Sequence, residues 1–351
     1  MSALKRLSLA AAAAGLLALP VAGPATFATT VSAQAPLNIK LATQAPVNSS
    51  WHKALLDMGA EWTAKTGGRV KLTVYAGGTQ GSEEATIRMM RPGVDQLQAN
   101  LLMVTGLAQL DEAFNAFGIP FFFESDAEAQ YVQQKLAPML EKKLQAKGYQ
   151  QLSWASAGWV QLFSKKQIST LAEVKAAKLF ANQGDEKMVQ WYKNNGFNAV
   201  GLAANDIPAQ LKLPNGMIDA APSPPYPALV LQIFRDAKYL LDVRVAPLIG
   251  ALVMTNDAWN KIAAADRPAI LAAAKAFETR INAEAPKQDA DSVTTMKTRG
   301  LVVTTLDSKA AAAFRAESEK LAATMRGGIV PADAYDMARQ ERDAFRKTKG
   351  K

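Results

Sequence analysis

The segments that follow residue 36 alternate in pattern, and this alternation limits the folds open to the chain. Residues 37–42 and 69–75 carry apolar and polar side chains in turn, the two-residue period of a strand with one buried face. Each is followed by a helix-like segment, 51–65 and 82–90, and Gly-Gly or Pro-Gly stops each helix. Strand, helix, strand, helix at this spacing is typical of an α/β domain and predicts a largely parallel sheet.

The alternation continues along the rest of the 351 residues, a length that suggests two domains. A long helical pattern covers 266–299, with Pro268 in its first turn and Pro286 inside it, where a kink is expected. A helix of that length spans about 45 Å, enough to brace two domains. Further strands are expected at 98–104, 151–155, 160–164, 178–181, 199–201, 218–220, 248–254 and 301–305, and further helices at 127–147, 185–194, from 257, and at 308–325.

The first residues have the pattern of an export signal. Lys5 and Arg6 precede the apolar run 7–19, and Val31-Ser32-Ala33 is a small-x-small cleavage site. We expect cleavage after Ala33, with Ala28 as the second choice. Thirteen apolar residues are too few to cross a bilayer, and a chain without Cys offers no site for a bacterial lipid anchor. The sequence therefore predicts a soluble protein released into the periplasm.

Composition excludes several kinds of chemistry. The absence of Cys removes disulfides, thiolate metal sites and Cys nucleophiles, and a single His rules out a multi-His metal centre. Without the two basic leader residues, 38 basic and 31 acidic residues remain, a net charge of +7. The basic residues are scattered among acidic ones, so nucleic-acid binding is not expected. The densest basic run is at the C-terminus, which we expect to be a frayed, solvated tail; it contains Arg342, Arg346, Lys347, Lys349 and Lys351.

Nothing in the sequence indicates catalysis. His52, the one ordinary imidazole base, lies in a first helical turn, and no G-x-S-x-G motif accompanies it. Gly77, Gly78 and Gly81 form a loop without the Lys-Ser/Thr of a phosphate-binding loop. We predict a binding protein with no cofactor, no metal site and no enzymatic activity, and keep a secreted hydrolase or isomerase as the alternative.

Several short motifs, taken in order, resemble those of one family. They are Ala42 through Pro46, Thr66-Gly67-Gly68-Arg69-Val70, Gly77…Gly81-Ser82-Glu83, Ile119-Pro120-Phe121-Phe122-Phe123, Glu173-Val174-Lys175-Ala176-Ala177-Lys178 and Asn215-Gly216-Met217-Ile218-Asp219. The three consecutive Phe residues are expected to form a buried corner. From about Leu37 to Met325, the chain resembles the substrate-binding proteins of tripartite ATP-independent periplasmic (TRAP) transporters, the DctP-like type.

The resemblance implies a two-lobe periplasmic binding protein of α/β class, type II-like, with a central cleft and the long kinked helix bracing both lobes. It implies a monomeric receptor that binds a small organic acid and delivers it to a TRAP-type membrane permease; the same fold could instead serve a sensor. Lobe 1 is expected to comprise 34–157 plus about 245–285, and lobe 2 to comprise 158–244 plus about 286–330, before a tail at 331–351.

The family's ligand-binding residues are only partly present here. The resemblance places the family's carboxylate-binding Arg at Phe180, a second Arg of some members at Val160, and an Asn at Ser223. Losing two charge-assisted hydrogen bonds of roughly 1.5–3 kcal/mol each changes what a pocket can hold. An aromatic pocket with Trp159 and Tyr226 is expected to suit a bulkier or less charged acid. Arg235, Lys178 or helix N-termini could still hold a carboxylate.

Eight residues are therefore predicted to bind the ligand. They are Gln44, Glu83, Asn100, Trp159, Phe180, Asp185, Ser223 and Tyr226. Gln44 follows the first strand, where α/β clefts gather their ligands. Helix capping would equally explain Glu83 and Asp185, and plain packing would explain Trp159 and Phe180. The loop around Ser223 and Tyr226 could be only a rigid Pro-rich connector.

Overall fold

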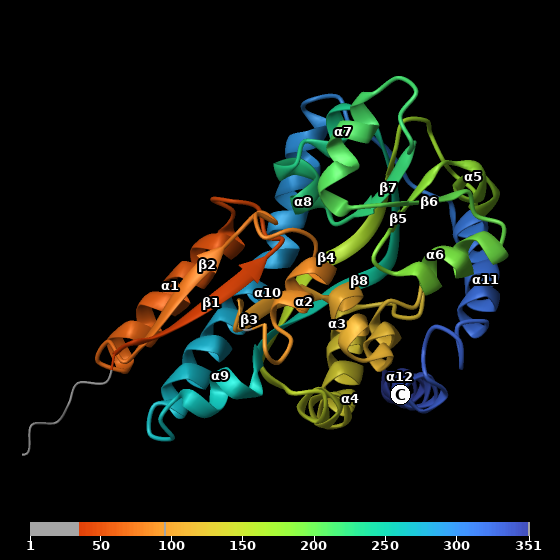
Figure 1. Ribbon diagram of the computed structural model, residues 1–351. Coiled ribbons are helices and arrows are strands. Elements are labelled where there is room, and N and C mark those ends of the chain that lie inside the picture. The colour runs from red at the N-terminus through yellow and green to blue at the C-terminus, as the bar shows by residue number, and fades with distance from the viewer. Residues whose placement is uncertain (1–34, 95, 350–351) are drawn as a thin grey trace, which may run out of the picture. The chain divides into compact units, whose positions relative to one another are not determined.

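The computed structural model describes residues 35–94 and 96–349, so the predicted signal peptide and its cleavage site lie outside the described residues. Within that part, nine strands form one sheet in the order β2-β1-β3-β8-β4-β7-β5-β6, with β9 beside β8 (Figure 1). The strands are β1 (Leu37–Thr43), β2 (Val70–Tyr75), β3 (Ala99–Met103), β4 (Tyr149–Ser164), β5 (Leu179–Asn182), β6 (Ala199–Leu202), β7 (Ala220–Ser223), β8 (Tyr239–Thr255) and β9 (Val302–Thr304).

The sheet is mixed, so the prediction of a largely parallel sheet is wrong at its centre. β1 pairs in parallel with β2 and β3, and β5 pairs in parallel with β6 and β7. Between these groups, the pairs β3–β8, β8–β4 and β4–β7 are antiparallel. The predicted strands 151–155 and 160–164 are one strand, because Gly158 takes a φ of +89° and the chain continues through a bulge.

The two long strands β4 and β8 connect two lobes. The first half of β4 pairs with the second half of β8. That half of β8 also pairs with β3, and β3 is followed in the sheet by β1 and β2. We call this part lobe 1. The second half of β4 pairs with β7, which is followed in the sheet by β5 and β6. The first half of β8 pairs with β9. We call this part lobe 2. The ladder between β4 and β8 shifts register where they pass from one lobe to the other, after Ser156 and after Val160.

Helices cover both faces of the sheet, and most begin at a side-chain cap. Ser49 caps the first helix by accepting a hydrogen bond from the backbone N–H of His52 (3.2 Å). The α-helices are α1 (Ser50–Lys65), α2 (Glu83–Met89), α3 (Val104–Leu110), α4 (Asp126–Ala146), α5 (Leu171–Ala176), α6 (Glu186–Asn194), α7 (Ile207–Lys212), α8 (Pro225–Val230), α9 (Asn256–Lys261), α10 (Arg267–Lys297), α11 (Ser308–Ala323) and α12 (Ala332–Lys349), with 3₁₀ turns η1 (Glu112–Phe117), η2 (Ala204–Asp206) and η3 (Ile233–Arg235). In the part of the chain described, no helix combines the length and apolar character needed to span a membrane.

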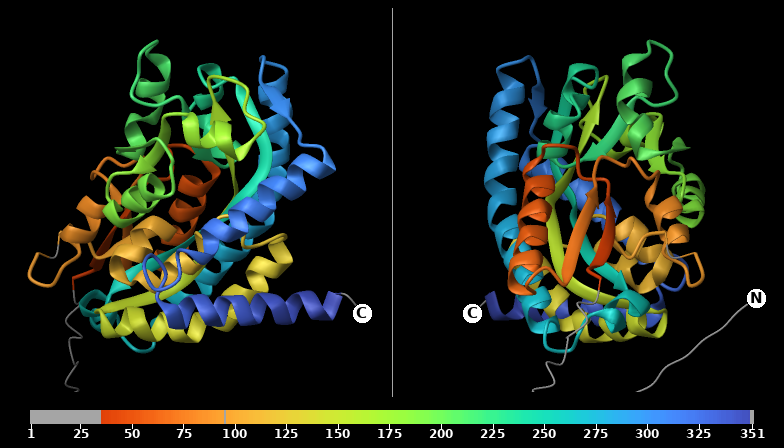
Figure 2. Two further views of the ribbon diagram at one scale, coloured as in Figure 1. Left: turned by 90° about the vertical axis from the view of Figure 1, so that its right-hand side faces the viewer. Right: turned by 60° about the vertical axis from the view of Figure 1, so that its left-hand side comes forward.

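The long helix α10 packs along β4 and touches both lobes, as predicted, through α1 on one side and α8 on the other (Figure 2). Its side chains satisfy N–H groups of β4. Glu278 accepts from the N–H of Trp154 (3.1 Å), and Asn282 accepts from that of Ser156 (3.0 Å). The helix thus hydrogen-bonds to a stretch of strand that would otherwise be an unpaired edge.

The Ile-Pro-Phe-Phe-Phe segment forms the predicted corner, but not all of it is buried. Phe122 and Phe123 are 2% and 3% exposed and join the core of lobe 1. Phe121 is only partly buried and has a φ of +59°, a region that non-glycine residues rarely occupy. Its N–H donates to the carbonyl of Val245 on β8 (2.6 Å), which holds the corner against the long strand.

The expectation of a frayed, solvated tail is wrong for Ala332–Lys349, which forms α12 beside α4 (Figure 2). Tyr335 and Ala338 enter the core of lobe 1. Arg346 donates from Nε to the carboxylate of Glu128 (2.6 Å), and Glu128 is 1% exposed. The basic residues that resembled a solvated run therefore include the side chain that docks this helix.

Candidate functional site

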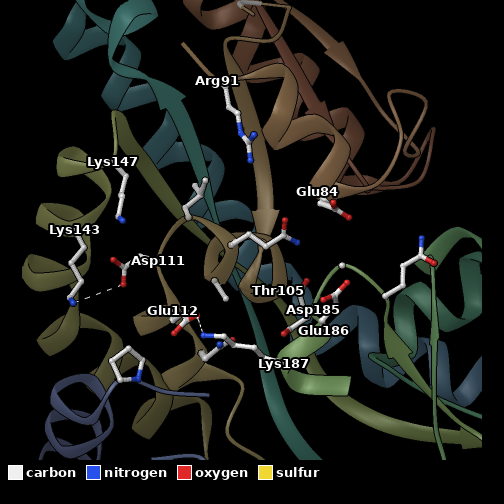
Figure 3. Close-up of a pocket in the computed structure, with 17 residues that line it drawn as sticks. Glu84, Arg91, Thr105, Asp111, Glu112, Lys143, Lys147, Asp185, Glu186 and Lys187 are labelled. Carbon is white, nitrogen blue, oxygen red and sulfur yellow. Dashed lines mark hydrogen bonds and ion pairs between the residues drawn. The ribbon is translucent and has the colours of Figure 1, made fainter. Parts of the chain in front are cut away.

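A cavity of about 710 Å³ lies between the lobes, beyond the carboxyl ends of β3 and β5 (Figure 3). This is the edge at which α/β sheets gather ligands. Lobe 2 contributes the turn after β5 and the start of α6, residues 183–187. Lobe 1 contributes side chains of α2, α3, η1 and α4 and of the residues that follow α2 and α4; those used below are Glu84, Arg91, Thr105, Gln109, Glu112, Lys143 and Lys147.

The cavity is strongly charged. Lys187 of lobe 2 forms an ion pair with Glu112 of lobe 1 across it, and Lys143 lies 4.0 Å from Asp111 (Figure 3). Arg91 and Lys147 extend toward the cavity from the side of lobe 1. Both signs of charge therefore line the cavity, and its cations are on side chains that the sequence did not single out.

The lobes also touch at two glycines. A Cβ at Gly184 would lie 3.2 Å from Nε2 of Gln109 and 3.5 Å from a carboxylate oxygen of Glu84, both in lobe 1. A Cβ at Gly78 would lie 2.5 Å from Nδ2 of Asn205 in lobe 2. At Gly78 a side chain would have to displace the Asn205 amide, whereas at Gly184 a Cβ would only press on Gln109, so a larger side chain is needed there to separate the lobes.

Of the eight predicted residues, Asp185 lines the cavity. Its carboxylate also caps α6 by accepting from the N–H of Met188 (3.0 Å), and burial raises its pKa above the ordinary value. Gln44 lies near the contact at Gly78, and its Nε2 donates to the carbonyl of Gly81 (2.8 Å). These two lie at the boundary between the lobes.

Glu83 and Asn100 are buried in lobe 1 and do not line the cavity. Asn100 donates to the hydroxyl of Thr86 (2.7 Å). Glu83 accepts from the N–H of Met103 (2.7 Å) and the hydroxyl of Thr105 (3.0 Å), at the start of α3. Burial raises the pKa of Glu83 and these hydrogen bonds lower it, and the net result is a pKa raised to about 7. Its contacts are those of a group that holds α3 in place.

Phe180, Ser223 and Tyr226 belong to lobe 2, and none lines the cavity. Phe180 is half-buried on β5 and packs against the core of its own lobe, on the strand face that also carries Asn182. Ser223 ends β7 and is buried. The hydroxyl of Tyr226 accepts from the N–H of Ser50 in α1 (3.1 Å), so it joins lobe 2 to lobe 1.

Trp159 lies at the bulge of β4 and is 7% exposed. Its indole N–H donates to Asp126 (2.8 Å), and the guanidinium of Arg244 lies over its ring at 5.3 Å. The predicted aromatic pocket of Trp159, Phe180 and Tyr226 is therefore not one wall, because each ring packs against a different element. The role of each of the eight residues in binding stays a prediction.

Sequence reasoning missed Asp289, which joins three elements at the bulge. Its carboxylate accepts from the N–H of Tyr226 on α8 (3.0 Å) and from that of Trp159, and it fills the space beside Gly158. Burial is the main cause that raises its pKa to about 6. Helical periodicity predicts that Asp289 shares a face with Asn282 and Glu278, but no local motif marks it as a contact to β4.

The raised pKa of Asp289 predicts a pH effect on stability. The unfolded chain has an ordinary Asp pKa near 4, so the folded form binds more protons between about pH 4 and 6, and stability falls as pH rises through that window. Asn cannot lose a proton, so Asp289→Asn should not lose this stability. Between pH 4 and pH 8, the unfolding free energy of Asp289→Asn minus that of the unaltered protein should therefore increase by about 1–2 kcal/mol, after allowing for partial exposure. Urea unfolding at both pH values measures this difference, and the exposed Asp291→Asn should leave it near zero.

Comparison with known proteins agrees with this architecture. The family model described as bacterial extracellular solute-binding protein, family 7, matches residues 41–327. A solute-binding protein of Verminephrobacter eiseniae is 23% identical over 264 residues, which cover 73% of this chain and 76% of that protein.

Solved structures are similar in fold. A TRAP periplasmic solute-binding protein of Xanthobacter autotrophicus, with bound β-D-galacturonate, matches with a TM-score of 0.78 and 20% identity, over 87% of this chain and 99% of that one. One of Desulfovibrio salexigens, with bound orotic acid, matches with a TM-score of 0.79 and 17% identity, over 88% and 99%.

Proposed function

Because this chain belongs to family 7 of the bacterial extracellular solute-binding proteins, we propose that it is a periplasmic receptor for a small organic acid. The acid would bind between the lobes and pass to a TRAP-type membrane permease, with no chemical conversion. The cavity beyond β3 and β5 carries this proposal, because it is bounded by both lobes and rimmed by cations. The similar proteins of known structure hold galacturonate and orotic acid, which supports an organic acid.

The proposed ligand is an anion that does not depend on the family's arginines. Residues 180 and 160 are Phe and Val, and the cations that line the cavity are Arg91, Lys143, Lys147 and Lys187. Exposed lysines hold an anion less rigidly than a guanidinium fork does, so a single carboxylate on a polar body suits the cavity better than a dicarboxylate.

Closure of the lobes would couple binding to delivery. The contacts at Gly78 and Gly184 and the ion pair of Lys187 with Glu112 form only when the lobes are together. We place the hinge at the bulge of β4 near Gly158 and at 242–245 of β8, where the ladder shifts register. A ligand that touches both lobes would shift the population toward the closed form that docks on the permease. We expect the receptor to act as a monomer.

Native mass spectrometry of the protein purified from its own periplasm tests the proposal. A stoichiometric organic acid released on denaturation would support it and identify the ligand. Turnover of that acid by the purified protein would instead favour a hydrolase or isomerase. A protein that retains no ligand and gives no thermal shift with any sugar acid or aromatic acid would contradict the proposal.

The contact at Gly184 provides a prediction for that ligand. Gly184→Leu should lower affinity at least about tenfold, because a branched side chain there meets Gln109 and Glu84 and holds the lobes apart. The φ of Gly184 is not in the left-handed region, so the change adds no backbone strain. Calorimetric titration measures the affinity. Gly328→Leu is the matched control, because a Cβ at Gly328 meets nothing within 4 Å; equal affinities in the two variants would remove this contact from the mechanism.

Phe180→Ala tests the position that the family resemblance selected. The resemblance implies that the half-buried ring of Phe180 meets the ligand, although it does not line the cavity in this structure. On that prediction, its removal should weaken binding about fivefold to tenfold without unfolding the protein. The same titration measures this, and circular dichroism checks the fold. Unchanged affinity would exclude Phe180 from the site and leave only the cavity residues.

A further inference from the structure

A second, smaller cavity of about 240 Å³ lies where the two lobes meet at β8, and no residue that lines it also lines the cavity described above. Four parts of the chain surround it. Lobe 1 contributes Phe121, Phe123 and Glu124 of the aromatic corner, and lobe 2 contributes residues of the segment after β9 and of α11. Residues 242–244 of β8 complete the lining.

The cavity lies at an irregular part of the sheet. Val160 of β4 pairs with Ala246, and Leu162 pairs with Leu241, so one residue of β4 faces four residues of β8. The extra residues, 242–245, bulge from the ladder toward the aromatic corner. A bulge of this kind redirects side chains and commonly lies beside functional sites.

Aromatic rings form the apolar part of this cavity. Phe121 of lobe 1 and Phe314 of lobe 2 meet edge to face, with ring centroids 5.1 Å apart. The backbone of Phe121 has a φ of +59° and is held by the hydrogen bond to Val245, while its partly buried ring packs against the core of lobe 2. An aromatic residue that keeps a disfavoured backbone conformation at a cavity indicates a function for that conformation.

Arg244 forms no close ion pair among the described residues, although its charge partly offsets the rise in the pKa of Asp289. Among the described residues its guanidinium lies over Trp159 but donates no hydrogen bond to a carboxylate. The other charged groups of the cavity are engaged, since Glu124 pairs with Arg315 and Asp242 accepts from Gln161 (2.7 Å). An anion that enters the cavity would therefore meet N–H groups of Arg244 that donate to no carboxylate of the described residues.

We propose that this cavity is a second binding site, for a small aromatic carboxylate, and that its occupant bridges the lobes. The ring would pack edge to face against Phe121 and Phe314, and the carboxylate would pair with Arg244. At about 240 Å³ the cavity is smaller than the 300–1,000 Å³ typical of drug-sized ligands, which limits the occupant to a single ring. Because its walls belong to both lobes, the occupant biases their relative position and so modulates binding in the larger cavity.

Benzoate is the probe that tests the site. Titration of the ligand-free protein, followed by NMR of ¹³C-labelled aromatic side chains, should show saturable shifts at Phe121 and Phe314 with a Kd of about 1 mM or below. Cyclohexanecarboxylate, of similar size but without a π-face, should bind at least about fivefold more weakly.

Two variants of α11 form a matched pair. Ala311 is exposed and lines the cavity, whereas the neighbouring Ala312 is exposed and does not, so neither change disturbs the core. Ala311→Trp should abolish the shifts, and Ala312→Trp should preserve them. Arg244→Gln should weaken binding about tenfold while the ring shifts persist at high benzoate.

Absence of saturation up to 20 mM, or equal binding by the two Trp variants, would overturn the proposal. Saturable shifts at other aromatic rings, with Phe121 and Phe314 unmoved, would overturn it as well, because benzoate would then bind elsewhere. None of these readouts uses the transported solute, so the result is independent of the proposed function.

Discussion

Arg346→Ala should destabilise the protein by about 2–4 kcal/mol, because it leaves the buried carboxylate of Glu128 without its counter-ion. Arg346 also donates to the carbonyl of Phe122 (3.2 Å), and Arg342 lies over the ring of Phe122 at 4.2 Å. The range is below that of a fully buried pair, because the Arg346 side chain is 32% exposed. Urea unfolding measures the global loss, and hydrogen exchange along α12 shows whether this helix detaches first.

Arg339→Ala is the matched control on the same helix. Arg339 lies 3.7 Å from Asp336, and both side chains are well exposed, so its removal should cost less than about 1 kcal/mol. Arg346→Lys should recover part of the loss, since it restores the charge but not the second donor. If Arg346→Ala and Arg339→Ala were equally stable, α12 would be held by apolar packing alone, and the ion pair would contribute nothing.

Gly158→Ala should destabilise the protein by about 3 kcal/mol or more. The φ of +89° disfavours any side chain, and a Cβ there would lie 1.9 Å from Oδ2 of Asp289. Asp289 would have to move, which would break its hydrogen bonds with the backbone N–H groups of Tyr226 and Trp159. Thermal or urea unfolding measures the loss.

Two further variants separate the two causes. Gly148 has a φ of +92°, and a Cβ there meets nothing within 4 Å, so Gly148→Ala should cost only the backbone term, about 1–2 kcal/mol. In a protein that already carries Asp289→Ala, Gly158→Ala should destabilise the fold by little more than Gly148→Ala does, because the clashing carboxylate is gone. A Gly158→Ala effect no larger than that of Gly148→Ala would mean that the carboxylate yields freely, and that the bulge is not a rigid hinge element.

Much of the secondary structure followed from local patterns. The period of two in residues 37–42 and the period of 3.6 in 127–147 appear as β1 and α4 within one residue at most boundaries. The family resemblance is also confirmed, by the family model and by the solved structures. These inferences succeed because backbone periodicity and capping are decided by neighbouring residues.

The sequence did not predict the centre of the sheet or the docked C-terminal helix. Residues 151–155 and 160–164 read as separate strands, since a local pattern does not reveal that Gly158 continues β4 through a bulge. The charged segment 332–349 reads as a solvated tail, since its apolar face is narrow and the partner of Arg346 is 218 residues away. Both errors arise from interactions between residues that are far apart in sequence.

The candidate site divides in the same way. By itself, the sequence determined the family, the α/β class and the export signal as expectations, and it located Asp185 at the start of a helix. Only the tertiary structure decided that Lys187 meets Glu112 across the cavity, that Gln109 faces Gly184, and that Asp289 joins Tyr226 to Trp159. The physical reason is that a site between two lobes consists of contacts between chain segments tens to hundreds of residues apart, whose positions depend on how β4 and β8 cross.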